Sequence, residues 1–212
     1  MRRKTFDAIL TAGGLVLAVV LLVAGGLLTW GHNFVTDQVH SQLAAEKIFI
    51  PAAGSEALAD PAIKPYLTQY GGQQLTTGAQ AKAYADHFIL VHMNKASDGK
   101  TYAELGSQQT ALKADIAKAK GAGTPTTALD QQLADLSVTR DTVFKGETLR
   151  GLLLNAYAFG TMGRIAGIAA IAAFSFAALM LLLVALGAWH LRRTPADTEL
   201  HVPGWHPEAV TT

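Results

Sequence analysis

Two long runs without a charged residue constrain this chain more than any other feature. The first extends from Ala8 to Trp30, 23 residues, and the second from Ile165 to Trp189, 25 residues. A helix of the shorter length is about 35 Å long, which is enough to cross a hydrocarbon core of ~30 Å. The sequence therefore predicts a membrane protein with transmembrane helices at 8–30 and 165–189.

A cleaved signal peptide is the alternative interpretation of the first run. Signal peptides have a shorter apolar region, roughly 7–15 residues, followed by a cleavage site with small residues. The residues after this run, from Leu28 to His32, read Leu-Thr-Trp-Gly-His and offer no such site. We therefore expect the first run to be retained as a span.

Basic residues next to both runs predict the orientation. Arg2–Lys4 precede the first run, and His190, Arg192 and Arg193 follow the second. Short basic flanks stay in the cytoplasm, whereas long loops are translocated largely regardless of their charge. We expect both termini, 1–7 and 190–212, to be cytoplasmic, and 31–164 to form a domain outside the plasma membrane. The tail, which contains three prolines, is expected to be disordered.

The composition of the middle segment excludes several classes of protein. Between His32 and Arg164 there are 12 Lys and Arg against 12 Asp and Glu, so no basic surface for nucleic acid is indicated. The chain has no cysteine. Disulfides, thiolate metal sites and cysteine nucleophiles are therefore excluded.

Helix start signals divide the middle segment. Val35, Val39 and Leu43 predict that the first helix continues to about Lys47. Capping boxes at Thr77 and Thr101 each begin a helix. The first helix carries Ala81, Tyr84, Phe88 and Val91 on its expected core face, and the second carries Leu105, Leu112 and Ile116 and ends near Lys120. Prolines and glycines predict an irregular segment between Pro51 and Gly72.

The last helix begins after a clear break at 121–125. An apolar pattern starts at Thr127, and no proline interrupts 128–193, so one long helix or two stacked helices lead into the second span. Leu133, like Phe88, is expected in the core. The predicted fold is an all-α membrane protein, two transmembrane helices with a small extracytoplasmic helical bundle inserted between them.

Small residues mark a packing face on the second span. Gly163 and Gly167 form a G-x-x-x-G step that Ala170 continues, and such residues let helix backbones approach closely. Packing of the two spans on each other is the favoured interpretation. Homo-oligomerisation, or docking on another membrane protein, is the alternative.

Chemical motifs are scarce. His87, His92 and Asp86 are the weak candidates for a metal site, but the two histidines lie about 140° apart on a helix. Surface or packed histidines are the favoured interpretation, and no metal site is predicted. Nucleophile elbows, Walker loops and zinc-protease motifs do not occur in the sequence. We therefore expect neither catalytic residues nor a cofactor.

One polar group next to the second span has two interpretations. Glu147, Arg150, Asn155 and Tyr157 could bind a lipid headgroup or a partner protein. They could instead form a buried network that fastens the domain to the spans, and this second interpretation is favoured.

Several segments carry a resemblance to a known family. These segments are Lys47–Pro51, Gly54–Leu58, Gln73–Phe88, Gly99–Tyr102 and Gly146–Phe159. Through them the chain resembles, over nearly its whole length, an uncharacterised family of two-span integral membrane proteins from actinobacteria. The resemblance implies no activity and no catalytic residues.

These observations together predict a non-enzymatic protein of the cell envelope. Its expected role is that of an accessory or scaffold component, with the lipid bilayer and another membrane protein or a second copy as partners. An extracytoplasmic sensor is the first alternative, although the tail after Arg193 is too short for a signalling domain. A metal-dependent enzyme is the second, and a transporter is the least favoured because the spans carry few polar groups.

Overall fold

The computed structural model describes residues 3–193 and Pro195, and within this range every regular element is a helix. The all-helical fold predicted from the sequence is confirmed. The chain divides into two compact units. The span unit comprises the described residues up to Asn33 and from Arg164 onward, and the middle unit comprises Phe34–Gly163. We describe each unit by itself.

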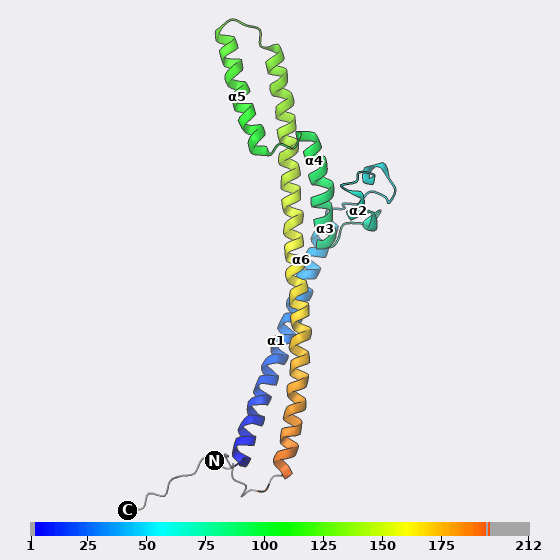
Figure 1. Ribbon diagram of the computed structural model, residues 1–212, viewed down its shortest axis with the longest axis vertical. Coiled ribbons are helices and arrows are strands. Elements are labelled where there is room, and N and C mark those ends of the chain that lie inside the picture. Colours follow the sequence, from blue (N-terminus) through cyan, green and yellow to red (C-terminus); the bar gives the residue numbers. More distant parts are fainter. Residues whose placement is uncertain (1–2, 194, 196–212) are drawn as a thin grey trace, which may run out of the picture. The chain divides into compact units, whose positions relative to one another are not determined.

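Within the described residues, two helices are long and apolar enough to cross a membrane. They are α1 (Arg3–Ala45) and α6 (Thr127–Arg193), the latter a single helix of 67 residues (Figure 1). The first four residues of the predicted tail, His190–Arg193, are helical, so the predicted disorder is wrong for them. They continue α6, since no glycine or proline lies among them. The remainder of the predicted tail, apart from Pro195, lies outside the described residues.

Small residues bring α1 and α6 together in the span unit. A Cβ atom on Gly25 would lie 2.9 Å from the ring of Phe174, so only glycine fits this contact. Gly167 faces the ring of His32 in the same way, again at 2.9 Å. The alanines on this side of α6 are buried: Ala170, Ala173 and Ala177.

Both capping boxes are confirmed in the middle unit. Thr77 accepts a hydrogen bond from the backbone N–H of Gln80 and begins α3 (Gly78–Tyr84). A π-helical turn, η3 (Ala85–Ile89), then leads into α4 (Leu90–Ser97). Thr101 caps α5 (Tyr102–Gly121) in the same way as Thr77 caps α3.

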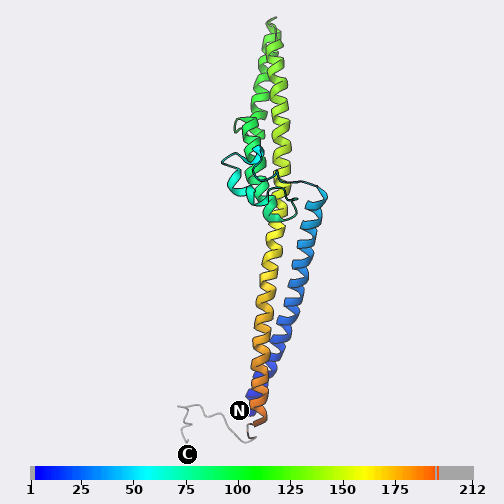
Figure 2. The same ribbon diagram turned by 90° about the vertical axis from the view of Figure 1, so that its right-hand side faces the viewer.

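α5 and the beginning of α6 form an antiparallel hairpin, which both views show side by side (Figures 1 and 2). Gly123, with φ +71°, lies in the predicted break between them. Leu105 and Ile116 are buried in the hairpin, but Leu133 is only half-buried. The prediction that Leu133 is a core residue is wrong, because its side chain is only partly covered in the hairpin.

The segment between α1 and α3 folds over a small core of its own. Ile50, Leu58, Ile63 and Leu67 are buried in it, and Phe88 packs against them while remaining half-buried. The predicted irregular segment contains three short helical turns: η1 (Glu56–Leu58), α2 (Lys64–Leu67) and η2 (Thr68–Tyr70).

A second core joins α1, α3 and α6 within the middle unit. Val39 and Leu43 of α1 meet Ala81 and Ala85 around Leu153 of α6. α3 approaches α6 so closely at Gly78 that a Cβ atom there would lie 3.1 Å from the Cα of Tyr157. This core holds the C-terminal part of α1 beside α6 and so positions the site described next.

Candidate functional site

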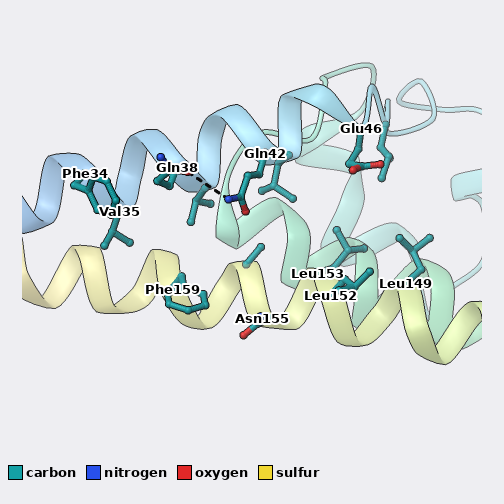
Figure 3. A pocket seen from close by; sticks show the side chains of 14 residues that line it. Phe34, Val35, Gln38, Gln42, Glu46, Leu149, Leu152, Leu153, Asn155 and Phe159 are labelled. Carbon is teal, nitrogen blue, oxygen red and sulfur yellow. Dashed lines mark hydrogen bonds between the residues drawn. The ribbon is translucent and has the colours of Figure 1, made fainter.

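A groove of about 620 Å³ lies between α1 and α6 in the middle unit. Figure 3 shows the two helices as its walls. Val35, Val39 and Leu43 of α1 line it together with Leu153 and Ala156 of α6. A volume of this size falls within the range of small-molecule sites, roughly 300–1,000 Å³.

The α1 wall of the groove is partly polar. Phe34, Gln38 and Gln42 follow one another every four residues and therefore share one side of α1, and Glu46 lines the groove just after the helix ends at Ala45 (Figure 3). The Nε2 of Gln42 donates a hydrogen bond to the Oε1 of Gln38 at 3.3 Å. This bond joins the two amides to each other, so the wall also presents their aliphatic stems.

The α6 wall is largely apolar and exposed, with Asn155 as its polar residue. Leu149, Leu152 and Phe159 are 38%, 63% and 48% exposed, although all three are large apolar side chains. The neighbouring Leu153 is 3% exposed because it points into the core with Val39 and Leu43. Of these two adjacent leucines, Leu153 is therefore buried in the core, whereas Leu152 is exposed on the surface.

A charged cluster connects α6 to the π-helical turn. Arg150 donates to Asp86 at 2.8 Å, and Lys82 of α3 forms an ion pair with the same carboxylate. The Nζ of Lys82 also lies 5.4 Å from the ring centre of Tyr157. Partial burial alone raises the pKa of Asp86, but the hydrogen bonds and charges of Lys82 and Arg150 outweigh it and lower the pKa below its ordinary value.

The polar group indicated by the sequence does not form one site. Arg150 and Tyr157 meet around Lys82 and Asp86, whereas Asn155 lines the groove. Glu147 lines a separate hollow of about 410 Å³ that Arg150 also borders. The contacts of Arg150 agree with a fastening role, since they tie α6 to η3.

The packing glycines both face α1. A Cβ atom on Gly163 would lie 3.2 Å from a methyl carbon of Val35, inside the middle unit. Gly167 faces His32 inside the span unit, and Ala170 is 4% exposed.

The three weak metal candidates have other contacts. His87 stacks on Tyr66 with ring centres 3.4 Å apart. The Nδ1 of His92 donates a hydrogen bond to the carbonyl oxygen of Phe88 at 2.8 Å. Asp86 forms ion pairs with Lys82 and Arg150. Over residues 3–193 and Pro195, no three His, Asp or Glu side chains are close enough together to hold a metal ion.

Sequence reasoning missed the groove. A signal was present, because Leu149, Leu152, Ala156 and Phe159 are spaced three, four and three residues apart, which is the spacing of a helix-packing face. The pattern does not say whether the face is filled by another helix of the chain or left open.

Comparison of the chain with known protein families, with curated proteins and with solved structures finds no match. The resemblance to the actinobacterial two-span family therefore stays a prediction from the sequence.

Proposed function

We propose that the chain is a non-enzymatic membrane protein of the cell envelope, which acts as an accessory or scaffold component through contacts of its middle unit. Residues 8–30 and 165–189 anchor it in the plasma membrane. The middle unit stands on the extracytoplasmic side, as a small helical bundle, and both termini are cytoplasmic. Its partners are the lipid bilayer and another membrane protein or a second copy.

The exposed apolar wall of the groove carries this proposal. Leu149, Leu152 and Phe159 lie outside the apolar runs and present large apolar side chains on a folded surface. Single exposed apolar residues are ordinary, but several that line one groove are typical of a contact site. The length of α1 and α6 supports the anchoring, and the basic residues beside both runs support the orientation.

Orientation is tested with single cysteines, which the cysteine-free chain allows without background labelling. Ser107→Cys is placed on the exposed surface of α5, and Thr5→Cys, also exposed, is its matched control at the other side of the first run. A membrane-impermeant maleimide applied to intact cells should label Ser107→Cys only. Labelling of Thr5→Cys alone would reverse the orientation.

The accessory role is tested by gentle extraction of tagged protein at native expression, followed by mass measurement of the intact complex. A stoichiometric protein partner or a defined homo-oligomer supports the role. A bare monomer without bound protein or lipid contradicts it.

A further inference from the structure

We propose that the hollow between α4, the turn before α5, and α6 binds a free amino acid, with its carboxylate at Arg150 and Lys100 and its ammonium group at Glu147. This inference goes beyond the proposed function, because it assigns a small soluble ligand to the middle unit. It requires neither a bilayer nor a protein partner.

Three segments that are far apart in the sequence enclose this hollow of about 410 Å³, and all of them belong to the middle unit. α4 supplies two apolar side chains and an amide, the turn before α5 supplies an ammonium group, and α6 supplies a carboxylate and a guanidinium. These side chains are Leu90, Met93, Asn94, Lys100, Glu147 and Arg150. Apolar walls with a few polar groups are typical of small-molecule sites.

The charges that line the hollow are not paired with one another. Glu147 and Arg150 are three residues apart on α6 and are therefore neighbours, with Cβ atoms ~5–6 Å apart. Arg150 nevertheless donates to Asp86 at 2.8 Å, and among the described residues no basic group lies within ion-pair distance of Glu147. Lys100 lies 3.7 Å from Asp98, whose side chain is 95% exposed, so water screens this pair. One carboxylate and two cations are thus available to a ligand.

Arg150 and Asn94 also keep hydrogen-bonding groups that the described part of the chain does not use. The guanidinium donates to Asp86 through Nη2, and its Nη1 has no partner there, although the side chain is 33% exposed. The backbone carbonyl oxygen of Asn94 accepts from the N–H of Gly99 at 2.8 Å, but its side-chain amide makes no such bond. A ligand carboxylate can accept hydrogen bonds from both groups, and the bond from the guanidinium is charge-assisted.

Two glycines leave the hollow open. A Cβ atom on Gly99 or on Gly151 would have no atom within 4 Å. Gly99 has a φ of +72°, so the turn itself requires a glycine. Gly151 lies inside α6, where glycine destabilises a helix relative to alanine, and no described neighbour packs closely enough to require it. A ligand that lies against the backbone of α6 accounts for this glycine.

The balance of charge distinguishes an amino acid from a simple anion. A phosphate or a dicarboxylate would lie beside Glu147 as well as beside the two cations, and like charges that are close together repel. An amino acid offers an opposite charge to each, and it carries both groups on one carbon atom, in keeping with the neighbouring positions of Glu147 and Arg150. Leu90 and Met93 then contact the side chain of the ligand, which favours an apolar amino acid.

The test uses the full chain in detergent. Thermal unfolding is measured with each of the common amino acids at millimolar concentration, and with inorganic phosphate. A ligand that binds only the folded state raises the melting temperature, and we expect the largest rise with an apolar amino acid. No rise with any amino acid, or a rise with phosphate alone, would overturn the proposal.

Calorimetric titration then compares the best amino acid with two analogues, the carboxylic acid that lacks the amino group and the amine that lacks the carboxyl group. Each analogue should bind about ten-fold more weakly, because it loses one charge-assisted contact. Equal affinity for the amino acid and the carboxylic acid would contradict the role of Glu147 and with it the proposal.

Glu147→Gln separates a contact with the ligand from a structural role. The variant should bind the amino acid about ten-fold more weakly and should not bind the carboxylic acid analogue more weakly, since only the amino group meets Glu147. Glu46→Gln, the same change in the groove between α1 and α6, is the matched control and should leave both affinities unchanged. Equal weakening of both ligands in Glu147→Gln would overturn the proposal.

Gly151→Leu fills the hollow without weakening the helix. It should abolish binding while the melting temperature of the chain without ligand does not fall, because leucine favours a helix more than glycine does. Gly121→Leu makes the same change at the end of α5, where a Cβ atom also has no atom within 4 Å and no contact with this hollow, and should bind normally. Unchanged affinity in Gly151→Leu would overturn the proposal.

These outcomes are separate from those of the proposed function. A chain in detergent needs no partner and no orientation, so a bare monomer in the mass measurement contradicts the accessory role while amino-acid binding stands. A chain that binds no amino acid but carries a stoichiometric partner overturns this inference alone.

Discussion

α1 and α6 pair in both units, but with side chains of different size. In the span unit the contacts are made by small residues, such as Gly25 against Phe174 and the buried Ala173. In the middle unit the same two helices still meet closely at Gly163 and Val35, but beyond this contact they carry leucine, phenylalanine and glutamine, and a groove remains between them. Close packing therefore depends on small residues, and larger side chains hold the backbones apart and leave a space that a ligand can fill.

The largest expected effect distinguishes the core side of α6 from its groove side. Leu153→Ala should lower the free energy of unfolding by about 2–5 kcal/mol, because Leu153 is buried among Val39 and Leu43. Leu152→Ala, one position away and 63% exposed, should change it by less than ~0.5 kcal/mol. Urea unfolding in detergent, followed by circular dichroism, measures both. Equal losses would mean that the groove wall is a second core.

Removal of the Arg150 side chain should have the next largest effect. Arg150→Ala leaves the carboxylate of Asp86, 18% exposed, without its partner from α6, and should cost about 2 kcal/mol in the same unfolding experiment. Lys145→Ala breaks an exposed pair with Asp141 on the same helix and serves as the control, at about 0.3–0.5 kcal/mol. A loss no greater than that of the control would show that the cluster does not fasten α6.

The same pair predicts a dependence on pH. The pKa of Asp86 is lower in the folded state than in the unfolded chain, so its contribution to stability is present above about pH 4 and is lost as the pH falls through the folded pKa. Asp86→Asn should therefore be less stable than the original chain at pH 7, and the difference should shrink in acid. A difference that stays constant from pH 7 to pH 3 would contradict the assignment.

Adjacent glycines test the close packing in the span unit. A Cβ atom on Gly25 meets the ring of Phe174, whereas one on Gly26 has no atom within 4 Å. Gly25→Ala should cost about 1–3 kcal/mol through overpacking, and Gly26→Ala should be neutral or slightly stabilising. Thermal unfolding in detergent compares the two variants. Identical melting temperatures would show that α1 and α6 do not depend on this contact.

The smallest expected effect concerns the start of α3. Thr77→Ala removes the cap that accepts from Gln80 and should cost about 1 kcal/mol. Thr142→Ala, within α6, removes a hydroxyl that bonds only the preceding turn, and should cost less than ~0.5 kcal/mol. Chemical unfolding of both variants provides the comparison, and a neutral Thr77→Ala would indicate that packing alone holds α3.

The local features of the fold were predictable because their causes are local. The two apolar runs, the capping boxes at Thr77 and Thr101 and the break before Thr127 each depend on residues within a few positions of one another. Leu133 was misplaced because its periodicity indicates one apolar face but not how many helices cover that face. The cluster of four polar residues was divided for a similar reason, since its members lie on different sides of α6.

By itself the sequence determined two membrane-length helices, the caps of α3 and α5 and an uncharged stretch of α6 from Ile165 to Trp189. Only the tertiary structure decided that Arg150 meets Asp86, 64 residues away, and that Leu152 is exposed in the groove while Leu153 is buried in the core beneath it. The physical reason is that the spacing of apolar residues along a helix indicates only which residues share a face. Whether that face meets a helix, a ligand or water depends on contacts between segments far apart in the chain.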